Sequence, residues 1–188
     1  MPGILFEQDS MKIEKEIMIK ALPEEVFDYI SDPRKIPDWI EGIERVEITS
    51  EGKGNGMTYR RHFKSKRYRL SLIKLRETIG EDSDEYQITE WVKNKKLAFR
   101  RISESKLLYF FPIRIEESYM LKPVHKKTGL TYNSEYSVGL LDRLFYRLLD
   151  PLGLVEKEFK KVTEKKVERS LNSLKNRLEE SSQIRQHL

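Results

Sequence analysis

A long amphipathic segment near the end of the chain follows a series of short alternating segments, and this order constrains the fold most strongly. From 43 to 138, apolar and polar residues alternate within segments separated by turn residues, which is typical of antiparallel strands. Beyond Pro151-Leu-Gly153, apolar residues recur at mostly three- or four-residue steps as far as Leu178, which predicts a long helix. An isolated helix of this kind would expose its apolar stripe to water, so we expect it to lie across the concave face of the sheet.

Helix-start signals occur twice between the first predicted strand and the rest of the sheet. Residues 12–20 alternate like a strand, with isoleucines on one face. Pro23 and the two glutamates after it are typical of a first helical turn, because proline needs no N–H partner there. Asp32, placed before a second proline, is a predicted N-cap, and Gly42 releases the chain into the next strand. We therefore predict an α+β fold in which a curved antiparallel sheet carries a long C-terminal helix, with two short helices after the first strand.

Three segments interrupt the regular pattern. Residues 64–84 are long and basic, and the apolar phase of the strand predicted over 68–79 slips, which indicates a bulge. Residues 107–113 are apolar where a hairpin turn is expected; they form either a buried strand start or a lip for transient contact with a membrane or another subunit. Residues 141–149 carry a short apolar stripe with helical spacing.

The length of 188 residues suits a single domain, which we place at 11–180, with flexible ends at 1–10 and 181–188. The chain has no cysteine and no apolar run near the roughly 20 residues that cross a bilayer, so we expect a cytoplasmic protein. Lys and Arg number 36 against 31 Asp and Glu, and the two signs are intermixed. This pattern favours a solvated surface over a specific nucleic-acid partner, and the density of Lys and Glu resembles thermophile usage.

The order of elements resembles the START-like (SRPBCC) superfamily, and above all its polyketide-cyclase/dehydrase and coenzyme-Q-binding-protein branch. The likeness is carried by Ala21–Ile30 with Pro37-Asp-Trp39 and Ile43–Val46, by Gly54-Asn-Gly56, and by Leu144–Leu178. The resemblance implies a helix-grip fold, in which the sheet wraps the final helix around a cavity for a hydrophobic small molecule. It does not imply catalysis, because the superfamily contains both carriers and enzymes.

Charged residues on apolar strand faces are the most informative irregularity. Arg61 is in phase with Tyr59, Glu90 with Ile88, Arg101 with Phe99, and Glu117 with Tyr119. Since an unpaired buried charge is costly, either arginine and glutamate pair with each other or these strands bend around a wet cavity where the charges meet the polar end of a ligand.

Aromatic residues recur on the same predicted inner faces. They could line a pocket, with tyrosine hydroxyls orienting a polar group, or they could simply form the core. The candidates are Phe27, Trp39, Tyr59, Phe99, Tyr119, Tyr132 and Tyr136. Together with the four charged residues they make up the predicted ligand-binding set.

Three function classes remain open from the sequence. The first is binding of a lipid, an isoprenoid quinone or a polyketide-like compound. The second is a cyclase or dehydratase in which Glu90 or Glu117 acts as general base. The third is a module whose basic clusters or residues 107–113 contact RNA, the ribosome or a membrane. Histidines 62, 125 and 187 are too scattered for a metal site and no hydrolase elbow is present, so we expect no catalytic motif of those types and no cofactor.

Overall fold

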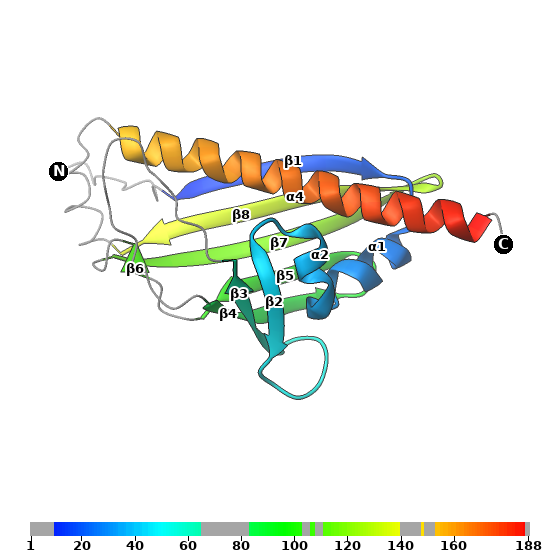
Figure 1. Ribbon diagram of the computed structural model, residues 1–188, viewed down its shortest axis with the longest axis horizontal. Helices are drawn as coiled ribbons and strands as arrows, with labels where there is room; N and C mark the ends of the chain where they lie inside the picture. Colours follow the sequence, from blue (N-terminus) through cyan, green and yellow to red (C-terminus); the bar gives the residue numbers. More distant parts are fainter. Residues whose placement is uncertain are drawn as a thin grey trace, which may run out of the picture.

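The computed structural model describes residues 10–64, 83–102, 106–107, 111–139, 148 and 153–186. Its strands pair antiparallel in the order β1-β8-β7-β5-β4-β3-β2, and β6 pairs with β7 beside this path (Figure 1). The strands are β1 (Met11–Ile19), β2 (Ile43–Ile48), β3 (Thr58–Phe63), β4 (Ser83–Val92), β5 (Lys96–Arg101), β6 (Lys106–Leu107), β7 (Phe111–Val124) and β8 (Lys127–Val138). The helices are α1 (Pro23–Ile30), the 3-10 helix η1 (Pro33–Lys35), α2 (Ile36–Trp39) and α4 (Leu154–Gln186). The predicted fold class is confirmed: short helices follow the first strand, and a long helix crosses a curved antiparallel sheet.

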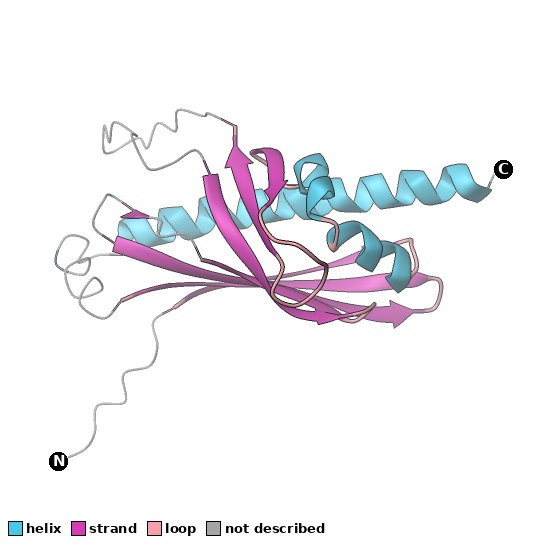
Figure 2. Cartoon of the chain, turned by 90° about the horizontal axis from the view of Figure 1, so that it is seen from below, coloured by secondary structure: helices cyan, strands magenta, loops and turns pink. Residues whose placement is uncertain are grey.

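The helix α4 lies along one face of the twisted sheet, beside β1 and α2 (Figures 1 and 2). It begins directly after Gly153, whose φ of +61° is a left-handed conformation that glycine adopts without strain. Leu171, Leu174 and Leu178 are buried, so the second half of α4 forms one wall of the core. The helix continues to Gln186, so helical structure extends into the segment from 181 onward that we predict to be flexible.

The short helices between β1 and β2 begin as the sequence predicts. Pro23 occupies the first position of α1, and the Glu25 side chain accepts a hydrogen bond from the Leu22 N–H at 2.9 Å. The Asp32 side chain caps η1 by accepting from the Arg34 N–H at 3.1 Å. At the end of α2, Trp39 is buried, with its ring edge-on to Tyr119 at 5.8 Å between centroids. The helix α2 therefore closes over the aromatic part of the core.

A bulge in β4 reverses the direction of its side chains. Ile88 is opposite Phe99 on β5, but Glu90 is opposite the next residue of β5, Ala98, so Thr89 is an extra residue in the ladder. Beyond it, Trp91 faces the core and Glu90 faces outward. The prediction that Glu90 shares the inner face with Ile88 is wrong, because the alternation does not continue through the bulge.

Other predictions lie outside the described residues. These are the strand over 68–79 with its bulge, the helical stripe between 141 and 149 apart from the exposed Leu148, and the side chains of the apolar segment 107–113. Among the helices that the structure describes, none is both long and apolar enough to span a bilayer.

Candidate functional site: a buried arginine–glutamate network

Arg61 lies at the centre of a polar network on the concave face of the sheet. It alternates inward with Tyr59 on β3, and its side chain is only 4% exposed. Its Nη1 donates to Glu117 Oε2 at 3.0 Å, and its Nη2 donates to the Tyr59 hydroxyl at 3.0 Å. The guanidinium of Arg61 therefore has two hydrogen-bond partners, one of them charged.

Aromatic rings surround the same guanidinium. Its carbon lies 3.8 Å from the centroid of the Tyr86 ring and 5.4 Å from that of Phe99. A cation over the negative face of an aromatic ring is stabilised by about 2 kcal/mol when water is excluded. The rings thus compensate part of the cost of burying the Arg61 charge.

Glu117 connects the arginine to the tyrosines of β8. Its second oxygen, Oε1, accepts a hydrogen bond from the Tyr132 hydroxyl at 2.8 Å. A carboxylate offers about four acceptor positions, of which these two bonds use only two. The Glu117 side chain is 11% exposed, more than that of Arg61, so it is the less enclosed member of the pair.

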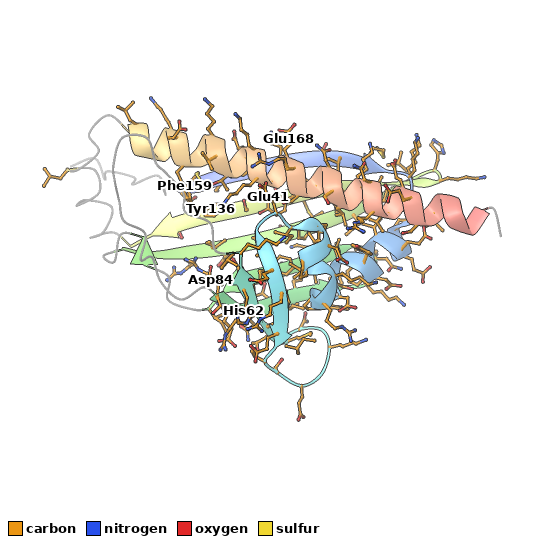
Figure 3. The ribbon with its side chains drawn as sticks, in the orientation of Figure 1. Glu41, His62, Asp84, Tyr136, Phe159 and Glu168 are labelled. Atoms are coloured by element: carbon orange, nitrogen blue, oxygen red, sulfur yellow. The ribbon has the colours of Figure 1, made fainter. Side chains whose placement is uncertain are left out.

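Beyond Glu117, the inner face is less completely covered. Tyr136 on β8 and Phe159 on α4 are both half-buried, with their rings edge-on at 6.0 Å between centroids (Figure 3). Ile115, which is opposite Tyr136 in the ladder, is also half-buried. In the other direction along β7, Tyr119 and Leu121 are fully buried. We call the region of Ile115, Glu117, Tyr136 and Phe159 the open end of the inner face.

The tyrosines near the network remain protonated at neutral pH. Burial and, next, the negative charge of Glu117 raise the pKa of Tyr119 and of Tyr132 well above the ordinary value. The same two causes, in the same order, raise the pKa of Tyr136 to about 12. These residues can therefore offer neutral hydroxyl groups as donors and acceptors.

A second ion pair lies beside the first. Arg101 Nη1 donates to Asp84 Oδ2 at 3.3 Å, and the two side chains are 5% and 17% exposed. Asp84 is absent from the predicted site because its segment reads as a polar turn in the sequence. Its spacing of two residues from the buried Tyr86 is the signal that would have placed it on the inner face.

Comparison with known proteins gives a family. A family model described as polyketide cyclase / dehydrase and lipid transport matches residues 10–179. The chain belongs to this family. No protein in a collection of curated proteins matches significantly.

Solved structures similar to this member of the polyketide cyclase / dehydrase and lipid transport family share its fold. TTHA0849 from Thermus thermophilus is 17% identical with a TM-score of 0.62, covering 92% of this chain and 99% of that one. The Zhui aromatase/cyclase from a Streptomyces species is 14% identical with a TM-score of 0.61, covering 90% and 94%. The di-domain aromatase/cyclase StfQ of the steffimycin biosynthetic pathway is 13% identical with a TM-score of 0.65, covering 92% and 52%. Identities this low show a common fold and nothing about substrate.

In this family member, ten of the predicted site residues lie on the inner side of the fold and one does not. Those inside are Phe27, Trp39, Tyr59, Arg61, Phe99, Arg101, Glu117, Tyr119, Tyr132 and Tyr136. Glu90 instead pairs with Lys96 at 2.6 Å and borders an open groove of about 390 Å³ on the outer face. Contact of the ten inner residues with a ligand stays a prediction. Within the described ranges, no three His, Asp or Glu side chains gather as metal ligands.

Proposed function

We propose that this protein binds a small hydrophobic molecule between the inner face of its sheet and α4, with the polar end of that molecule beside Glu117. The observation that carries the proposal is the pair of Arg61 and Glu117, which is buried on a mostly aromatic and aliphatic face next to the open end. The family description, which names lipid transport, agrees with a hydrophobic ligand.

The energetics of buried ion pairs support a functional role for this network. Removing two charges from water costs several kcal/mol per ion, and an apolar pair of similar volume is often as stable or more stable. A chain under selection for stability alone would not need Arg61 and Glu117 at this position. Ionisable groups held in apolar surroundings beside an open region are typical of binding and catalytic sites.

The apolar part of the ligand would lie against the partly covered side chains. Ile115, Tyr136 and Phe159 each keep some exposed surface at the open end. Burying such surface contributes roughly 25 cal/mol per Å². A ligand of modest size could thus gain most of its binding free energy from these contacts, with the polar network setting its orientation.

The enzyme hypothesis is less well supported by the geometry. A general base needs an inner carboxylate without a neutralising partner. Glu117 is paired with Arg61, and Glu90 faces outward and pairs with Lys96. The similar structures include aromatase/cyclases, but the sequence identities of these proteins to this chain are 13% to 14%. The geometry therefore favours binding over catalysis by either glutamate.

Native mass spectrometry and displacement of a neutral dye test the proposal. Protein purified without detergent should retain a small-molecule adduct, or should bind Nile red saturably after delipidation. Phe159→Ala should weaken Nile red binding, whereas Val162→Ala, on the exposed side of α4, serves as the matched control. Absence of both adduct and saturable dye binding would contradict the proposal, and binding that disappears in moderate salt would favour a charged surface partner instead.

A further inference from the structure

The open end contains one charged residue, Glu117, and its charge limits what a ligand can be. Glu117 Oε1 accepts a hydrogen bond from the Tyr132 hydroxyl at 2.8 Å. Arg61 is almost fully enclosed behind Glu117, under the Tyr86 ring. A molecule that enters at the open end therefore meets a carboxylate before it meets a guanidinium.

The arginines of the inner face already face carboxylates. Arg61 holds Glu117, and Arg101 holds Asp84. A carboxylate ligand held by one of these arginines would have to break its pair or lie beside Glu117, and both arrangements leave a negative charge poorly compensated in a region of low polarity. A hydroxyl group has no such cost, since Glu117 keeps two acceptor positions that no hydrogen bond among the described residues occupies.

From these contacts, and resting on the proposed function, we infer that the ligand is uncharged and ends in a hydroxyl group that donates to Glu117. Ionised fatty acids and other organic anions are excluded by the same carboxylate. Tyr136, half-buried near Glu117, carries a neutral hydroxyl that interacts with Ser134 and Tyr132 and lies where its oxygen can accept from a ligand hydroxyl. The ligand class is thus a long-chain alcohol, a sterol-like alcohol or a phenol rather than an acid.

Matched twelve-carbon probes separate charge from chain length. Dodecanol, methyl laurate, dodecane and laurate would each compete with Nile red for the delipidated protein, at a pH where laurate is ionised. We expect dodecanol to bind most tightly and laurate to bind roughly 5- to 140-fold more weakly, since an unsatisfied buried polar group costs about 1–3 kcal/mol and each 1.4 kcal/mol is tenfold. Laurate binding as tight as dodecanol binding would overturn the inference while leaving the proposed function intact. Failure of every probe and of Nile red would instead overturn the proposed function.

Two variants assign the effect to Glu117. Glu117→Gln removes the negative charge and leaves Arg61 unneutralised, so laurate should gain roughly 5- to 140-fold relative to dodecanol. Glu116→Gln, exposed on the outer face of the same strand, should leave the order of the four probes unchanged. Lys15 points inward on β1 and is half-buried, so among the described residues it is a further cation that could hold an anion. If laurate displaced Nile red from the wild type but not from Lys15→Met, the ligand would be an acid held by Lys15 and the inference would be wrong. Circular dichroism checks that each variant is folded, and the wild-type ranking alone decides the inference if Glu117→Gln does not fold.

Discussion

Arg61 and Glu117 form a 3.0 Å ion pair although two strands, β4 and β5, separate their own strands in the sheet. In a flat sheet, three strand spacings would hold β3 and β7 about 14 Å apart. Only a concave sheet directs both side chains toward a common point. The pair therefore depends on the curvature of the sheet, and it also ties the two sides of that curved sheet together.

A double-mutant cycle on this pair should show strong coupling. Arg61→Met and Glu117→Leu each leave one buried charge without its partner, so each should lower the free energy of unfolding by about 3 kcal/mol or more. The double variant should be closer to the wild type than the sum of the single effects predicts, because no charge remains to be compensated. Urea denaturation followed by circular dichroism measures all four proteins. Additive effects would show that the two side chains do not interact in solution.

Glu90 and Glu117 should respond differently to the same chemical change. Glu90→Gln removes a charge from an exposed pair with Lys96, and such pairs contribute roughly 0 to 1 kcal/mol. Glu117→Gln removes the counter-charge of a buried arginine and should cost clearly more. The thermal midpoints of the two variants compare them directly. If Glu90→Gln lowered the thermal midpoint as much as Glu117→Gln or more, the inner Glu117 would not be the carboxylate that stabilises the fold, and the prediction would be wrong.

Stability should fall in alkaline solution because of the buried tyrosines. Unfolded tyrosine releases its proton near pH 10, whereas Tyr136 in the folded protein holds its proton until about pH 12. Between these values the unfolded state binds fewer protons than the folded state, so the free energy of unfolding decreases as the pH rises. Urea midpoints across this window should therefore decline, and Tyr136→Phe should reduce the decline without abolishing it, because the pKa values of Tyr119 and Tyr132 are also raised. A native-state titration in which all tyrosines ionise near pH 10 would contradict this expectation.

The two halves of α4 should serve different purposes. Leu174→Ala removes a fully buried side chain from the core and should cost about 2–5 kcal/mol in stability. Phe159→Ala affects a half-buried ring at the open end, so it should cost much less in stability but weaken Nile red binding. Denaturation and dye titration on both variants test this separation. If Phe159→Ala destabilised the protein as much as Leu174→Ala, the open end would be an ordinary part of the core.

Strand alternation predicted the inner positions wherever the ladder is regular. Arg61, Arg101 and Glu117 lie on the inner face as their phase indicates, since nothing interrupts the period of two along their strands. Their partners were not predictable from this alternation, because Arg61 meets Glu117 through the curvature of the sheet. Arg101 meets Asp84 at a strand end whose sequence is typical of a polar turn. The apolar stripe of the terminal helix predicted its position against the sheet and its length as far as Leu178. It did not predict the last turns of the helix, since an exposed helix end needs no apolar pattern.

The extra residue at Thr89 also has a consequence for anyone who transfers residue roles between relatives. On β4 the side chains that point inward are even-numbered up to Ile88 and odd-numbered from Trp91, so the alternation of side chains changes phase once along the strand. A related chain with the same residues but a regular ladder at this point would carry the tryptophan on its solvent side and the glutamate in its interior. For this strand, superposition of structures therefore identifies equivalent positions more reliably than alignment of sequences.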